Sequence, residues 1–160
     1  MEELIQRVIE KLMIRQKNTL ILSFDRPIST VDYGEKDFIC NHIIRLEGVS
    51  YSFLDGLKDS ANPWVDWLLT ASRFGCRIQI QANFDSLHWL PEELFLKWPL
   101  EIYHPDGRQC HCCAGQIITY EKVMSVPSGS NLVIRSDQRM TAIAEEALQK
   151  RDVLLLGREK

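Results

Sequence analysis

The densest group of reactive side chains is a run of three cysteines and one histidine, Cys110-His111-Cys112-Cys113. Thiolate sulfur and imidazole nitrogen are good ligands for zinc or iron. Residues along a strand alternate sides, so Cys110 and Cys112 should face one way and His111 and Cys113 the other. At most two then reach one ion, whereas structural zinc uses four ligands. His104 could be a third, but we expect the cysteines to fill a sheet as small apolar residues, with metal or redox use as the alternative.

Other motifs for catalysis or cofactor binding are missing from the sequence. No phosphate-binding glycine loop and no G-x-S-x-G serine elbow occurs. The four histidines show no H-x-x-x-H spacing. Four tryptophans could stack a flavin or a base, but such residues more often belong to a core. We therefore expect no catalytic residue, no cofactor and no metal, and the tryptophans that we assign to the core are Trp64 and Trp67.

The composition is that of a globular protein without a positively charged stripe. The 160 residues carry 19 Lys and Arg against 22 Asp and Glu, a net charge of −3, which argues against a dedicated nucleic-acid binder. The longest apolar run, residues 153–156, is far shorter than the roughly 20 residues of a membrane span. The N-terminus shows no secretory signal, and the cysteines number five, so we expect reduced thiols in a cytoplasmic protein.

Strand and helix patterns alternate along most of the chain. Strands are predicted at residues 19–24, 42–51, 76–84, 100–103, 132–134 and 153–156, and helices at 63–74, 91–97, 120–124 and 142–150. Asn62 followed by Pro63 is a good helix start, and Thr141 can cap the last helix. This order predicts an α/β fold with a small mixed, partly parallel sheet flanked by helices.

Three further expectations concern loops and edges. Residues 25–41 contain Pro27, Gly34 and many polar side chains, and they predict a loop or a mobile insertion. The turn Pro105-Asp106-Gly107 predicts a hairpin between residues 100–103 and the segment after Arg108. The fully apolar residues 153–156 are typical of a strand in a sheet that is covered on both faces.

The first residues predict an amphipathic N-terminal helix, from residue 2 to residue 16. Its apolar residues occupy one half of the helical wheel: Leu4, Ile5, Val8, Ile9, Leu12 and Met13. Either this stripe packs on its own domain, or the helix binds a partner. The residues themselves favour neither alternative. We divide the chain into residues 1–17, an amphipathic helix that could dock a partner, and residues 18–160, a single α/β domain.

Five short segments carry a family likeness: ASRFGCRIQI at 71–80, LEIY at 100–103, DG at 106–107, AGQIITYEKV at 114–123 and MTAIAEEA at 140–147. In this order, behind an amphipathic helix, they resemble the PduM family of propanediol-utilisation proteins, which belong to bacterial microcompartments. The resemblance covers nearly the whole chain. It implies a component needed to assemble a polyhedral protein shell around diol metabolism. It supplies no catalytic residues.

The resemblance and the residues together lead to one functional prediction. We expect a non-enzymatic structural and assembly component of a cytoplasmic bacterial microcompartment for 1,2-propanediol degradation, linking shell and cargo. Its partners would be shell proteins, encapsulated enzymes or both, with no nucleic acid and no membrane. The partner-binding residues would be the six apolar residues of the N-terminal helix. The alternative is a small cofactor- or metal-handling enzyme inside the compartment, related to flavin or cobalamin.

Overall fold

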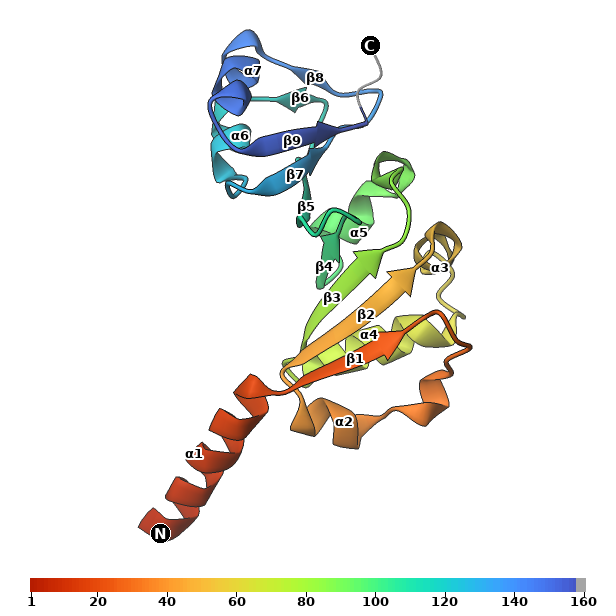
Figure 1. Ribbon diagram of the computed structural model, residues 1–160, viewed down its shortest axis with the longest axis vertical. Coiled ribbons are helices and arrows are strands. Elements are labelled where there is room, and N and C mark those ends of the chain that lie inside the picture. Colours follow the sequence, from red (N-terminus) through yellow and green to blue (C-terminus); the bar gives the residue numbers. More distant parts are fainter. Residues whose placement is uncertain (158–160) are drawn as a thin grey trace.

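A computed structural model describes residues 1–157 as an α/β protein with a projecting N-terminal helix (Figure 1). The helices are α1 (Glu2–Lys17), α2 (Glu35–Cys40), α3 (Tyr51–Gly56), α4 (Pro63–Arg73), α5 (Glu92–Leu96), α6 (Tyr120–Ser125) and α7 (Ala142–Gln149), with 3-10 turns η1 (Thr30–Asp32) and η2 (Leu87–Trp89). The strands are β1 (Thr19–Ser23), β2 (Ile43–Val49), β3 (Arg77–Ala82), β4 (Leu100–Tyr103), β5 (Cys110–Cys112), β6 (Ile117–Ile118), β7 (Ser130–Val133), β8 (Arg139–Met140) and β9 (Val153–Leu156). The predicted fold class, sheets flanked by helices with an N-terminal helix, is confirmed.

The largest sheet has the strand order β1-β2-β3-β4, and all its strands run parallel. One face is apolar: Ile44 and Leu46 of β2 and Ile78 and Ile80 of β3 are all buried. This face packs on α4, which lies behind the sheet in Figure 1. The other face is mainly polar, with Arg45 and Glu47 of β2 and Gln79 and Gln81 of β3, although Ile21 of β1 also lies on it. Parallel sheets are usually covered on both faces, so a polar second face is unusual.

The chain beyond β4 forms smaller sheets with a second hydrophobic cluster. Strands β5, β7 and β9 make a three-stranded parallel sheet, and β6 pairs with β8. The second cluster is built from residues that follow β5, beginning with Cys113, and includes Ile118, Val123, Leu132, Ala144 and Leu148. The buried apolar residues of the described chain thus fall into two clusters. The division into residues 1–17 and a single domain at 18–160 stays a prediction.

Helix α4 begins where the sequence indicates. The side-chain oxygen of Asn62 accepts a hydrogen bond from the Trp64 N–H at 3.0 Å, and Pro63 takes the first helical position. The chain turns out of the helix at Gly75, whose φ of +75° suits glycine. Trp67 is buried, and its indole N–H donates to the Tyr33 carbonyl at 2.9 Å. The predicted core position of Trp67 is confirmed, and Trp64 is partly buried against the same core.

The prediction of a loop at residues 25–41 is wrong in its second half. This segment contains η1 and α2. An Asp37 carboxylate oxygen accepts a hydrogen bond from the Gly34 N–H at 2.8 Å, which closes the first turn of α2. Phe38 then points into the main core, where it is almost fully buried. One buried aromatic residue and one capping carboxylate therefore order a stretch whose composition is polar.

Three other expectations are corrected. The strand predicted for residues 42–51 ends at Val49, because Ser50 caps α3 by accepting a hydrogen bond from the Phe53 N–H at 3.3 Å. The predicted hairpin is reduced to a single antiparallel bridge between Tyr103 and Gln109, since β5 pairs with β7 instead. Strand β9 is not covered on both faces: it is an edge strand, and Leu154 is exposed.

Candidate functional site

The apolar stripe of α1 is open to solvent. Of the sixteen residues of this helix, all within the described part of the chain, none is buried. The six predicted partner-binding residues, which we call the α1 stripe, are 43% to 67% exposed: Leu4, Ile5, Val8, Ile9, Leu12 and Met13. The helix extends away from the main sheet at one end of the molecule (Figure 1). The alternative in which the stripe packs on its own domain is therefore wrong, and partner binding stays a prediction.

The last turn of α1 is fixed to the body by one arginine. The Nη2 atom of Arg15 donates to the Phe74 carbonyl at 2.6 Å and to the Phe38 carbonyl at 3.2 Å. The same nitrogen lies 3.7 Å from the Cys76 sulfur. Asn18, which links α1 to β1, donates from its side chain to the Cys40 carbonyl at 3.0 Å. These contacts hold the helix by its C-terminal end while leaving the α1 stripe free for another surface.

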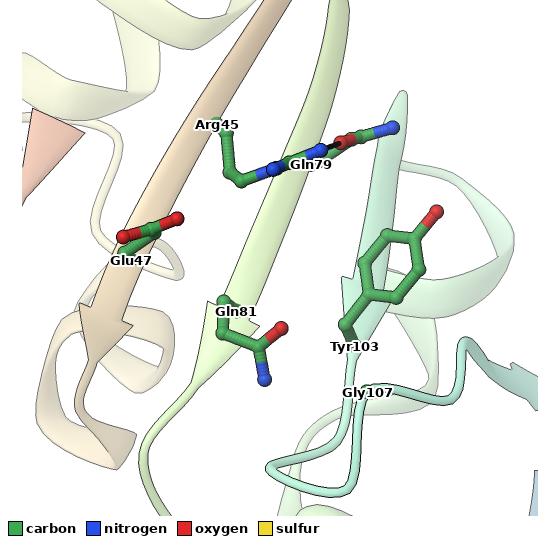
Figure 2. Close-up of a pocket in the computed structure, with 6 residues that line it drawn as sticks. All are labelled: Arg45, Glu47, Gln79, Gln81, Tyr103 and Gly107. Carbon is green, nitrogen blue, oxygen red and sulfur yellow. Dashed lines mark hydrogen bonds between the residues drawn. The ribbon is translucent and has the colours of Figure 1, made fainter. Parts of the chain in front are cut away.

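A polar hollow of about 250 Å³ lies on the uncovered face of the main sheet (Figure 2). Its lining residues come from β2, β3, β4 and the turn after β4: Arg45, Glu47, Gln79, Gln81, Tyr103 and Gly107. The Arg45 guanidinium donates from Nε and Nη2 to the Gln79 side-chain oxygen at 3.1 and 3.0 Å. Gln81 donates to the His104 carbonyl at 2.8 Å. Burial, and next the charge of Glu101, raise the pKa of Tyr103.

The chemistry of the polar hollow is that of hydrogen bonding. The lining residues, all described, offer guanidinium, amide and phenol donors beside one carboxylate, and they include no Ser, Cys or His to form the usual nucleophile–base pair. Sequence reasoning missed this site because these residues are simply the polar half of alternating strands. The alternation of polar and apolar residues along each strand could have indicated this site. When parallel strands pair in register, their polar residues lie on the same face of the sheet.

The cysteine run lies between the two hydrophobic clusters. Cys110 is buried in the main cluster, and Cys113 is buried in the second. Burial raises the pKa of Cys110 to about 12 and that of Cys112 to about 11, so both thiols stay protonated at neutral pH. His104 lies against Asp85 and Asp106. Within residues 1–157, no three His, Cys, Asp or Glu side chains are grouped so that they could hold a metal ion.

The structure is thus that of a small α/β protein with an exposed amphipathic helix, and comparison with known proteins gives its family. The model of the family described as "putative propanediol utilisation" (PDU_like) matches residues 3–154. The chain belongs to this propanediol-utilisation family, and the assignment to PduM itself stays a prediction. No curated protein and no solved structure matched the chain. None of the helices within residues 1–157 is long and apolar enough to cross a membrane.

Proposed function

We propose that this protein is a non-enzymatic structural and assembly component of a bacterial microcompartment that degrades 1,2-propanediol, and that it belongs to the PduM branch of its family. Family membership supports the link to propanediol utilisation. The observation that carries the assembly role is the exposed α1 stripe, held out from the body by Arg15. In this role α1 docks on a shell protein or an encapsulated enzyme and links shell to cargo.

The α1 stripe has the properties of a docking helix. A helix of this length is marginal in water unless its apolar face is covered, so a partner surface stabilises it. Full burial of one Leu, Ile or Met side chain contributes about 1.5–3 kcal/mol, and the stripe has six partly exposed apolar side chains to cover. Its polar half mixes acids with bases, among them Glu3 paired with Arg7. A membrane-surface helix would instead carry a face rich in Lys and Arg.

The test compares two double variants of the full chain. Val8→Glu with Ile9→Glu places two charges in the α1 stripe, where burying them opposes docking. Gln6→Glu with Ile14→Glu is the matched control, since it adds the same charge to exposed residues outside the stripe. We expect the first variant to be at least tenfold depleted from purified microcompartments, and the control to be retained. Equal incorporation of both variants would show that α1 does not recruit the protein.

The rival hypothesis, a cofactor- or metal-handling enzyme, has a separate test. We expect the purified protein to contain no stoichiometric zinc or iron and to show no flavin or cobalamin absorbance. We also expect replacement of Cys110 and Cys112 by serine to leave the protein folded. A tightly held metal ion that is lost in the Cys110→Ser, Cys112→Ser variant would overturn the non-enzymatic proposal.

A further inference from the structure

A second exposed apolar surface lies at the opposite end of the molecule from α1. Helices α6 and α7 pack against each other beyond the main sheet (Figure 1). Between them is a groove of about 310 Å³, which we call the α6/α7 groove. Its apolar side chains are Tyr120, Met124, Ile143 and Ala147, and the first three are 46% to 66% exposed. An apolar groove between two helices is a common receptor for an amphipathic helix.

We propose that the α6/α7 groove binds the α1 stripe of a second copy of this chain. The chain thus carries both halves of a helix-in-groove contact. The α1 helix of the same molecule cannot fill the α6/α7 groove, because Arg15 and Asn18 fix that helix at the far end of the molecule. A second copy can present the same stripe without any change in the fold. This inference goes beyond the proposed function, because it does not depend on which compartment protein is bound.

The charges beside the two surfaces are complementary. At one end of the groove, the Arg151 guanidinium donates to the carbonyls of Met124 at 3.0 Å and Val126 at 2.7 Å. These acceptors are neutral, and Arg151 has no carboxylate partner within the described chain. On α1, Glu2 borders the stripe in the first turn, and it forms no ion pair with any residue up to 157. If α1 lies antiparallel to α7, Glu2 of one copy meets Arg151 of the next.

The dipoles of the two helices also favour antiparallel docking. The positive N-terminal end of α1 then lies beside the negative C-terminal end of α7. The contact joins two different surfaces, so it is heterologous: each copy offers one helix and one groove, and copies add head to tail. At the end of such a row one α1 stripe stays free. That free helix is the one available to a shell or cargo protein under the proposed function.

The test uses one variant that blocks the helix and one that blocks the groove. Val8→Glu with Ile9→Glu blocks the α1 stripe. Ile143→Glu blocks the groove, and folding should tolerate it, because residue 143 is exposed and a glutamate suits the first turn of α7. Ile117→Glu, also exposed but outside the groove, is the matched control. Sedimentation velocity over a range of protein concentrations measures assembly of the full chain and of each variant.

We expect the unmodified chain and the Ile117→Glu control to form larger species as concentration rises. Each blocked variant should remain monomeric. An equimolar mixture of the two blocked variants should form a dimer and nothing larger, because one intact helix and one intact groove remain in each pair. Incorporation of the Ile143→Glu variant into microcompartments should persist, so a failure of this proposal is distinguishable from a failure of the proposed function.

Three results would overturn the inference. The first is an unmodified chain that is monomeric at every concentration up to the millimolar range. The second is assembly that is lost in the helix-blocked variant but kept in Ile143→Glu, since this result indicates that two α1 helices pair with each other. The third is a mixture of blocked variants that stays monomeric although each variant retains its fold.

Discussion

Helices α1 and α4 are both amphipathic, and only α4 buries its apolar residues in its own chain. Trp67, Leu68 and Ala71 of α4 pack under the main sheet, whereas the α1 stripe remains in solvent. The difference teaches that an amphipathic pattern predicts a need for an apolar surface and does not say which molecule supplies it. Here α4 is covered by its own sheet, and the surface for α1 must come from another molecule.

The ends of the two helices meet at a single anchor. The Arg15 side chain of α1 reaches the Phe74 carbonyl at the C-terminal end of α4, and it also reaches the carbonyl of Phe38 in α2. Polar contacts therefore fix the direction of α1, while its stripe stays 43% to 67% exposed. A docking helix with a defined direction loses less conformational freedom on binding than a disordered tail does.

The largest expected change in the free energy of unfolding comes from α4, the helix whose apolar residues are buried. Trp67→Ala removes a ring that packs edge-on against Phe38, at a centroid distance of 5.0 Å, and it leaves the Tyr33 carbonyl without its donor. Truncation of a buried tryptophan typically costs about 3–5 kcal/mol of unfolding free energy. Chemical denaturation followed by circular dichroism measures the loss. A loss below about 1 kcal/mol would show that α4 is not a core helix.

A smaller effect is expected at the anchor. Arg15→Ala leaves the carbonyls of Phe74 and Phe38 without this donor, and loss of hydrogen bonds from a charged group costs about 1–3 kcal/mol. Arg7→Ala is the control, because Arg7 forms only an exposed ion pair with Glu3, which should contribute at most about 1 kcal/mol. If the two variants unfold at the same denaturant concentration, Arg15 does not anchor α1.

The buried thiols predict a further, pH-dependent effect. Burial raises the pKa of Cys110 from 9.0 to about 12, so between these values the folded chain binds more protons than the unfolded chain. The free energy of unfolding must therefore fall as the pH rises above 9. A Cys110→Ala variant should lose less stability over that interval. A difference between the two proteins that stays constant from pH 7 to pH 11 would contradict the burial of this thiol.

Sequence reasoning recovered the elements whose signals are local. Asn62 and Pro63 mark the start of α4, and Thr141 accepts a hydrogen bond from the Ala144 N–H at 3.3 Å as the predicted cap of α7. The N-terminal helix also lies where its apolar spacing predicts. In each case the deciding interaction joins residues within one or two helical turns, so the pattern is visible without knowledge of the fold.

The features that sequence reasoning missed depend on contacts between distant residues. Helix α2 is ordered by burial of Phe38 against Trp67, a contact that composition does not reveal. The polar hollow exists because Arg45 and Gln79 lie in register on neighbouring parallel strands. The exposure of Leu154 follows from the edge position of β9, which strand order alone determines. None of these three features is determined by the spacing of residues that are close in the sequence.

The most direct test of the central claim, that the α1 stripe serves another molecule, is the free energy of unfolding of the Val8→Glu, Ile9→Glu variant, measured at a protein concentration where the chain is monomeric. Glutamate is a better helix former than valine or isoleucine, and both positions are solvent-exposed. We predict a change of less than about 0.5 kcal/mol from the unmodified chain. A loss of about 3 kcal/mol, similar to that expected for Trp67→Ala, would show that the stripe belongs to its own core and would contradict the claim.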